Sequence, residues 1–332
     1  MMEPLIKSLL NDYQRNFPLE PAPFAQIARR LNTSPETVLK ILKELQDKGA
    51  VSRVGPVFRP NTVGTSTLAA MAVAAEKLET VAAVISDFPQ VNHNYEREHH
   101  YNLWFVVTAE NSAALTETLH KIQQATGYRV LSLPLVRDYH IDLGFRMNLD
   151  RGAGLSQIST QEAEPVIHPG RELLFGGVED LIEVIQGGLP LVTRPYREIA
   201  QQLGCSEQAV IDKLHGMIED GIIKRLGVVV RHHELGYRAN AMMVWDVPDD
   251  CIDQLGRQLG KQDCVTLCYQ RPRRLPDWPY NLFCMVHGCD RNEVLACIER
   301  MIDGLGLAAV PHTVLFSGKR FKQRGARYRG IH

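Results

Sequence analysis

Apolar residues recur at helical spacing in two stretches of the chain that match each other at a constant offset of 172 residues, from Phe24 to Tyr196. In each stretch a first helical pattern leads to a serine, Ser34 or Ser206, placed where it would cap a second helix. A glycine and a short apolar strand follow. This order predicts a helix-turn-helix with a β-extension in both halves.

The remainder of each half alternates strand and helix patterns in the same order. In the first half we expect strands, helices and strands over 68–76, 78–88, 91–98, 101–109, 112–127 and 128–145. In the second half the matching elements are 241–248, 251–261, 265–271, 280–288, 291–304 and 308–316. The order is βαββαβ in both cases, which predicts an α+β fold with two ferredoxin-like domains.

These patterns divide the chain into two copies of one two-domain protein. We expect a helix-turn-helix domain (1–64), a ferredoxin-like domain (65–147), a polar linker (148–170), a second helix-turn-helix domain (171–237) and a second ferredoxin-like domain with a basic tail (238–332). The tandem plan resembles the Lrp/AsnC transcription regulators. That resemblance implies that the two halves pair with each other as a pseudo-dimer, and it leaves further homo-oligomerisation open.

Composition narrows the class of protein. The chain has 332 residues, 45% of them hydrophobic, and no apolar run approaches the roughly 20 residues that span a bilayer. The N-terminus does not have the pattern of a signal peptide, so we expect a cytoplasmic protein without a membrane partner. All seven cysteines lie in the second half and none forms a CxxC pair, which favours buried, reduced thiols over disulfides or a metal site.

Charge argues against DNA as a partner. The net charge is −1, and the expected recognition helix of the second half carries four acidic residues against Lys213. In the first half Lys40 and Lys43 are accompanied by Glu36 and Glu44. An acidic helix is repelled by phosphates, so a DNA-binding regulator is the alternative and not the leading hypothesis.

The densest chemistry lies in VNHNYEREHHYNLWFV (91–106). Alternation along a strand would place Val91, His93, Tyr95 and Arg97 on one face, with His99 and His100 in the turn that follows. The matching strand of the second half carries four residues on its equivalent face, and the longer loop after it carries three more: Val265, Leu267, Tyr269, Arg271, then Arg273, Arg274 and Trp278. Imidazoles in one half favour acid/base or metal-ligand chemistry, and guanidiniums in the other favour binding of a flat, anionic substrate. A solvated hairpin is the alternative.

This stretch, together with YHIDLGF (139–145) and VLFSGKRFKQRGARY (314–328), resembles the siroheme decarboxylases in their fused form. The resemblance implies a non-oxidative carboxy-lyase that removes the C12 and C18 acetate carboxyls of siroheme. The product would be 12,18-didecarboxysiroheme, an intermediate of heme d1 or alternative heme biosynthesis. No cofactor is expected beyond the iron of the substrate. A DNA-binding regulator and a heme sensor or carrier remain the alternatives.

The resemblance also implies roles for individual residues. His93 and His99 are the candidates for the proton donor and for orienting the departing carboxylate. The substrate's iron would be ligated by one of His93, His99, His100 and His140, or that histidine would contact the ring edge instead; spacing does not choose between them, and His140 is the candidate put forward. The basic tail is expected to cover the substrate or the partner half. The remaining candidates would bind the carboxylates or the flat ring: Tyr95, Arg97, His100, Tyr269, Arg271, Arg273, Arg274 and Trp278, with Trp104 and Phe105 beside them. His287, on an expected core strand, is interpreted as structural.

Overall fold

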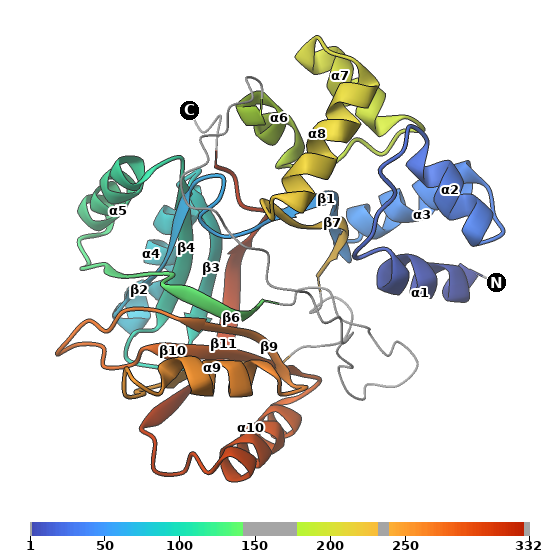
Figure 1. Ribbon diagram of the computed structural model, residues 1–332. Coiled ribbons are helices and arrows are strands. Elements are labelled where there is room, and N and C mark those ends of the chain that lie inside the picture. The colour runs from blue at the N-terminus through green and yellow to red at the C-terminus, as the bar shows by residue number, and fades with distance from the viewer. Residues whose placement is uncertain (1, 142–177, 232–238, 329–332) are drawn as a thin grey trace. The chain divides into compact units, whose positions relative to one another are not determined.

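The computed structural model describes residues 2–141, 178–231 and 239–328 (Figure 1). The expected linker, the end of the YHIDLGF motif, His232 and His233 lie outside the described residues. Two compact units make up the chain. The first, here called the helix-turn-helix unit, comprises 1–64, 159–231 and 325–332, and the second, the sheet unit, comprises 65–158 and 232–324. The domain boundaries expected from the sequence stay a prediction.

The helix-turn-helix unit repeats three helices and a strand. Its elements are α1 (Met2–Asp12), α2 (Pro23–Arg30), α3 (Pro35–Asp47), β1 (Val51–Phe58), α6 (Val178–Ile185), α7 (Pro195–Leu203), α8 (Glu207–Glu219) and β7 (Ile223–Val230). Ser34 accepts a hydrogen bond from the Thr37 amide at 3.2 Å, and Ser206 accepts one from the Ala209 amide at 3.1 Å. Both predicted N-caps are therefore confirmed. β1 and β7 pair antiparallel, so the two β-extensions form one small sheet.

The repeat begins earlier than the sequence patterns indicated. α1 and α6 were not expected. Matching apolar residues in these helices, or directly after α1, are buried at the same offset of 172: Leu9, Leu10 and Tyr13 in the first copy, Leu181, Ile182 and Ile185 in the second. Each is a short helix that precedes the stretches in which the repeat was recognised. Each copy thus has three helices rather than two.

The sheet unit contains the two ferredoxin-like repeats, and their βαββαβ order is confirmed. The first has β2 (Thr65–Met71), the short 3-10 helix η1 (Ala75–Lys77), α4 (Leu78–Asp87), β3 (Val91–Arg97), β4 (Leu103–Ala109), α5 (Ser112–Thr126), β5 (Leu131–Pro134) and β6 (Arg137–Ile141). The second has β8 (Ala239–Trp245), α9 (Ile252–Gly260), β9 (Val265–Gln270), β10 (Leu282–Gly288), α10 (Arg291–Leu305) and β11 (His312–Gln323).

The last strand of each repeat crosses into the sheet of the other. β11 pairs with β8 over 312–316 and with β3 from Ser317 onward. The strand expected over 128–145 divides in the same way, since β5 pairs with β2 and β6 pairs with β9. The resulting order is β5-β2-β4-β3-β11-β8-β10-β9-β6, and only Leu135 and Val136 separate the strands at its two ends. The expected pairing of the two halves is therefore present, through exchanged strands (Figure 1).

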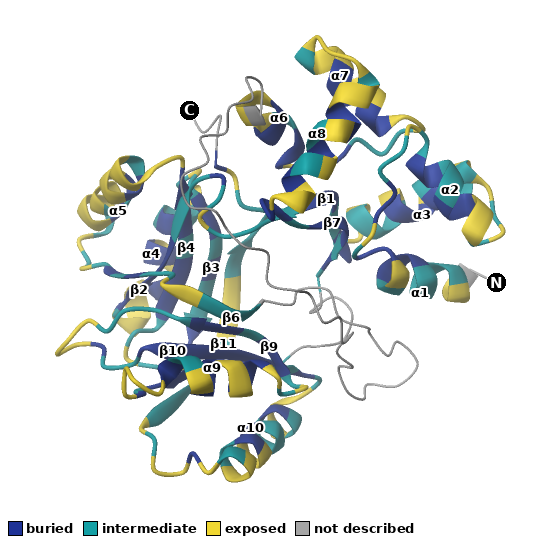
Figure 2. Ribbon diagram, in the orientation of Figure 1, coloured by how far each residue is buried: buried dark blue, intermediate teal, exposed yellow. Residues whose placement is uncertain are grey.

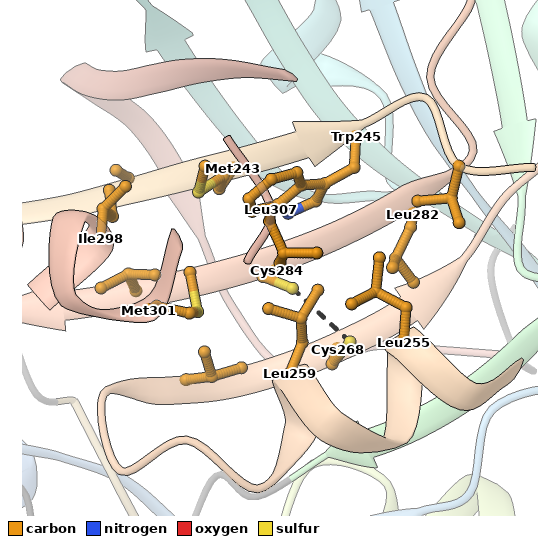
Figure 3. Close-up of a cluster of buried hydrophobic side chains, with 14 of the residues drawn as sticks. Met243, Trp245, Leu255, Leu259, Cys268, Leu282, Cys284, Ile298, Met301 and Leu307 are labelled. Atoms are coloured by element: carbon orange, nitrogen blue, oxygen red, sulfur yellow. Dashed lines mark hydrogen bonds between the residues drawn. The ribbon is translucent and has the colours of Figure 1, made fainter. Parts of the chain in front are cut away.

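Three apolar clusters fill the sheet unit. One lies between the first repeat's strands and its helices α4 and α5, and a second lies between the second repeat's strands and α9 and α10 (Figure 3). The third, here called the inner core, takes residues from the opposite strand faces of both repeats, including Trp104, Phe283 and Leu315. Figure 2 shows these strands as largely buried. Each strand therefore has a helix-side face and an inner face, and side chains alternate between them.

Cysteine chemistry differs in part from expectation. Cys264 and Cys297 form a disulfide, so the prediction of reduced thiols is wrong for this pair. Cys297 lies on α10 and Cys264 directly precedes β9, and both pack against the same cluster. Their Cα atoms are 6.6 Å apart, which is within reach of a disulfide although 33 residues separate them in sequence. Cys268 and Cys284 are buried and reduced as expected, with their Sγ atoms 3.5 Å apart (Figure 3). Cys205 and Cys251 are exposed rather than buried.

None of the helices in the described ranges combines the length and the hydropathy needed to span a membrane.

Candidate functional site

A β-bulge decides which residues of β3 face the inner core. Val91 is in register with Val107, but the next pair is His93 with Val106, so Asn92 is an extra residue. Val91 packs in the helix-side cluster, whereas His93, Tyr95 and Arg97 face inward. The expectation that Val91 shares their face is wrong, because the bulge shifts the alternation by one residue.

The second repeat has the same bulge at the equivalent place. Leu267 is in register with Met285, and the next pair is Val265 with Val286, which leaves Thr266 as the extra residue. Val265 packs on the helix side, and Leu267 and Tyr269 face the inner core. The expectation that Val265 shares a face with Leu267 and Tyr269 is therefore also wrong. Both repeats therefore present a matched inner face, with histidine in one and leucine in the other.

Two arginines, Arg97 buried and Arg271 partly buried, extend these faces in a pseudo-symmetric way. Arg97 donates from Nη1 to the carbonyl of Leu315 at 3.1 Å, and Arg271 donates to the carbonyl of Leu133, so each bonds to the crossing strand of the other repeat. Burial lowers the pKa of Arg97 to about 10 and also lowers the pKa of Arg271. Within the described part of the chain, no carboxylate pairs with either guanidinium. A buried cation without a counter-ion is a strong attractor for an anionic ligand.

His93 is fixed by its neighbour in the bulge. Its Nδ1 lies 2.7 Å from Oδ1 of Asn92, and since the amide oxygen only accepts, Nδ1 is the donor. The ring lies parallel to Tyr95, with the centroids 6.2 Å apart. This arrangement holds the tautomer and orientation of a half-buried imidazole, and Nε2 is then the atom that can exchange a proton with a bound ligand.

His99 and His100 lie in the turn between β3 and β4. Nδ1 of His99 accepts a hydrogen bond from the Tyr101 amide at 3.0 Å, so the proton of its neutral form is on Nε2. Burial lowers the pKa of His99, and the neighbouring His100 lowers it further. At neutral pH His99 is therefore an uncharged donor, while His100 is exposed.

Trp104, Phe105 and Trp278, which were predicted to contact the substrate, are packed in the apolar clusters of the sheet unit. Trp278 is fully buried in the inner core, with its ring centroid 5.2 Å from that of Trp104, 5.0 Å from Tyr280 and 5.6 Å from His99. Phe105 faces the helix-side cluster, because it alternates with Trp104 along β4. The expectation that Phe105 contacts the substrate is therefore wrong, and the binding role of Trp278 stays a prediction.

Arg273 and Arg274 lie in the loop after β9 but differ in their partners. Arg273 is held by two carboxylates, donating to Asp246 at 2.7 Å and to Asp249, and it also donates to the Val247 carbonyl. Arg274 is exposed and donates from Nε to the Ser132 carbonyl at 3.0 Å. Two carboxylates already balance the charge of Arg273, so it attracts an anionic substrate less than the exposed Arg274 does. Both binding roles stay predictions.

The structure does not bring His140 together with His93 and His99. His140 lies on β6, in register with Cys268 of β9 and at the far end of the strand order from β3. It packs closely against Gly260 of α9. If Gly260 carried a Cβ atom, that atom would lie only 2.8 Å from the Cβ of His140. Its predicted role as a ligand of the substrate's iron is untested. Among the described residues, no group of three or more His, Cys, Asp or Glu side chains is arranged to hold a metal ion.

His287 is a neighbour of the site that the sequence patterns did not single out. It follows Phe283 and Met285 at alternate positions on β10, so it lies on the inner face, and Nδ1 is 2.9 Å from the Thr266 hydroxyl. Burial lowers the pKa of His287 to about 4, and repulsion by Arg97 contributes. The parity of β10 was the available signal, but a lone histidine at the end of an apolar strand is usually structural.

Replacing His287 with asparagine should remove an acid sensitivity of the fold. The unfolded chain protonates this histidine below pH 6.5 and the folded chain only near pH 4, so stability falls as pH drops between these values. The wild type should lose on the order of 2 kcal/mol from this group by pH 4.5. His287→Asn keeps a partner for Thr266 but does not titrate. Urea unfolding at pH 7 and pH 4.5 checks this, and equal pH losses in both proteins would contradict it.

Comparison with known proteins identifies the class first. Residues 62–140 and 234–322 match the AsnC-like ligand binding domain, and residues 7–51 and 179–224 match the siroheme decarboxylase NirDL-like helix-turn-helix domain. The protein is thus a fused pair of helix-turn-helix and AsnC-like ligand-binding units. Over 335 residues it is 42% identical to the siroheme decarboxylase NirDL subunit of Paracoccus denitrificans, covering 98% of this chain and 97% of that protein. The chain belongs to the siroheme decarboxylase family.

Two further similarities bear on assembly and ligand. The siroheme decarboxylase NirD subunit of Pseudomonas aeruginosa is 46% identical over 150 residues, which is 45% of this chain and 100% of that subunit. The crystal structure of siroheme decarboxylase NirDL in complex with an iron-uroporphyrin III analogue has a TM-score of 0.66 at 28% identity, covering 97% of this chain and 93% of that one. One half of this chain therefore corresponds to a whole subunit elsewhere, and a solved relative binds an iron tetrapyrrole.

Proposed function

We propose that the protein removes the C12 and C18 acetate carboxyls of siroheme as carbon dioxide and releases 12,18-didecarboxysiroheme, in heme d1 or alternative heme biosynthesis. The observation that carries this is the 42% identity to a siroheme decarboxylase across 98% of the chain. That similarity extends through both halves and favours the enzyme over a DNA-binding regulator. The absence of DNA binding and the cytoplasmic location stay predictions.

The inner faces of the two repeats supply the chemistry that a polycarboxylate needs. Arg97 is buried and Arg271 partly buried, and carbonyl groups use only part of their donors, so each guanidinium can form a two-point bond to a carboxylate. Tyr95 and Tyr269 precede them on the same faces and can donate hydroxyl hydrogen bonds. Siroheme carries eight carboxylates, so several must be matched by cations when the ring leaves water.

The reaction balances without a redox partner. The bond between the acetate methylene and its carboxylate breaks, carbon dioxide leaves, and the electron pair remains on the methylene, where it is conjugated with the ring. One proton per carboxyl then completes the methyl group. We assign this proton to Nε2 of the His93 imidazolium, since Asn92 holds the opposite nitrogen, and we assign to neutral His99 the orientation of the departing carboxylate. No cofactor beyond the substrate's iron enters this scheme.

Anaerobic incubation of the purified chain with siroheme, followed by mass spectrometry of the tetrapyrrole, tests the function. We expect a product lighter by two carbon dioxide units, with release of both gas equivalents. Spectral binding with unchanged siroheme would replace the enzyme by a heme sensor or carrier. If siroheme neither binds nor reacts, while the chain shows salt-sensitive binding to DNA, the regulator would replace it.

A further inference from the structure

The residue between Arg97 and His99 is held by the second repeat. Glu98 accepts a two-point bond from Arg291, the first residue of α10, with Nη1 at 2.7 Å from Oε1 and Nη2 at 2.8 Å from Oε2. These hydrogen bonds lower the pKa of Glu98, so the pair is charged at neutral pH. Two parallel bonds fix the direction of the carboxylate as well as its distance. The turn that carries His99 is therefore attached to a helix of the other repeat.

Phe316 of β11 completes this attachment. The Glu98 amide donates to the carbonyl of Phe316 at 3.0 Å, and the guanidinium carbon of Arg291 lies 3.9 Å from the centroid of the Phe316 ring. A guanidinium is attracted to the face of an aromatic ring, and this stacking restricts its rotation. Phe316 is itself packed in the helix-side cluster of the second repeat. One backbone bond, one ion pair and one stacking contact thus join Glu98 to that repeat.

His99 contacts the opposite side of the sheet. Its amide donates to the Arg97 carbonyl at 2.9 Å, and its ring lies edge-on to Trp278 of the inner core. Glu98 therefore contacts α10 on the helix side, and the next residue places its imidazole on the inner side. Because only one peptide bond separates the two residues, a displacement of Glu98 also displaces the imidazole of His99.

The equivalent hairpin of the second repeat has different residues at both positions. Pro272 takes the place of Glu98, since each directly follows the inner-face arginine of its strand. Ser112 takes the place of Arg291, since each is the first residue of the helix after the hairpin. Neither a proline nor a serine side chain is charged, so the ion pair has no counterpart there. The loop after β9 is instead fixed within its own repeat, by the bonds of Arg273.

We propose that Arg291 is a positioning residue for the decarboxylation, which holds His99 through Glu98 at the place where the imidazole meets the departing carboxylate. This rests on the proposed function, and it specifies what α10 of the second repeat contributes to the reaction. Arg291 does not contact the substrate in this scheme. Its loss therefore slows the reaction at saturating siroheme and leaves tetrapyrrole binding nearly unchanged.

Single-turnover assays of the purified full chain with siroheme, in parallel with titration by iron-uroporphyrin III, test this. Arg291→Gln should slow decarboxylation about tenfold, since a misplacement of about 1 Å can cost up to about 100-fold in rate. Arg291→Lys should lose less, because it keeps the charge but not the two-point geometry. The affinity for iron-uroporphyrin III should stay near that of the wild type. Arg300→Gln, at an exposed arginine of the same helix, is the matched control and should keep the wild-type rate.

Two double variants test whether Arg291 acts through its neighbours. Glu98→Gln with Arg291→Gln should be no slower than either single variant, because each change already breaks the pair. His99→Ala with Arg291→Gln should be no slower than His99→Ala alone, because the group to be positioned is absent. Urea unfolding of each variant separates lost positioning from a lost fold, and the midpoints should change little, since an exposed ion pair contributes little to stability.

Three results would overturn the inference while leaving the proposed function intact. One is a folded Arg291→Gln protein with the wild-type rate, and another is a full tenfold loss on adding Arg291→Gln to His99→Ala. The third is an Arg291→Gln protein whose tetrapyrrole affinity falls as much as its rate, which would make Arg291 a substrate ligand. A wild-type chain that leaves siroheme unchanged would overturn the proposed function itself, and the inference with it.

Discussion

Replacing His93 with alanine is expected to slow siroheme decarboxylation by about 10²–10⁴-fold, the range typical for loss of a positioned general acid. Nδ1 of His93 is held by Asn92 at 2.7 Å, so the ring delivers its proton from a fixed direction. His93→Gln should lose nearly as much, since the amide can hydrogen-bond but cannot supply the proton. Binding of iron-uroporphyrin III should change much less than turnover, because the arginines remain.

Single-turnover assays under anaerobic conditions measure this, with carbon dioxide release and tetrapyrrole mass followed together. His120→Ala is the matched control, because His120 is an exposed histidine on α5 whose Nε2 lies 2.8 Å from Nε2 of Gln124 on the same helix. It should retain wild-type turnover. A His93→Ala protein that decarboxylates siroheme at the wild-type rate would remove His93 from the chemistry and leave His99 as the remaining candidate acid.

Most of the fold could be predicted from local sequence patterns. The helix-turn-helix repeat, its serine caps and the βαββαβ order all follow from short-range periodicity, which depends on neighbours within one element. The crossing strands do not. Whether residues 128–145 form one strand or two depends on which partners lie at each end, and β5 and β6 pair with strands from different repeats. Pairing of this kind is a long-range property that periodicity does not encode.

The site shows the same division. Tyr95, Arg97, Tyr269 and Arg271 were found from their repetition at matched positions, and they face the inner core. Their exact faces were missed because a one-residue bulge at Asn92 reverses parity, and nothing in an asparagine marks it as extra. Likewise, the two carboxylates that bind Arg273 lie 24 and 27 residues away from it in sequence. The sequence of its own loop therefore gave no sign that its charge is balanced.

Replacing Trp278 with alanine is expected to destabilise the sheet unit by about 3–5 kcal/mol, the cost typical of removing a buried tryptophan. The side chain is fully buried and contacts aromatic rings from both repeats, with Tyr101 at 6.0 Å and Phe283 at 6.1 Å between centroids. No hydrogen-bond partner of its Nε1 is present among the described residues. Trp278→Phe therefore removes side-chain volume but no hydrogen bond, and it should lower the free energy of unfolding far less than Trp278→Ala.

Equilibrium urea unfolding followed by far-ultraviolet circular dichroism measures these costs independently of tryptophan fluorescence. Arg274→Ala, on the exposed surface of the same loop, is the control for stability and should shift the midpoint little. A Trp278→Ala protein with near wild-type stability but weakened tetrapyrrole binding would reverse the interpretation. The ring would then belong to the substrate surface, as its sequence position first indicated, and the inner core would have to open around it when the ligand binds. Lost stability with binding retained in the folded fraction would instead make Trp278 the packing element that joins the two repeats.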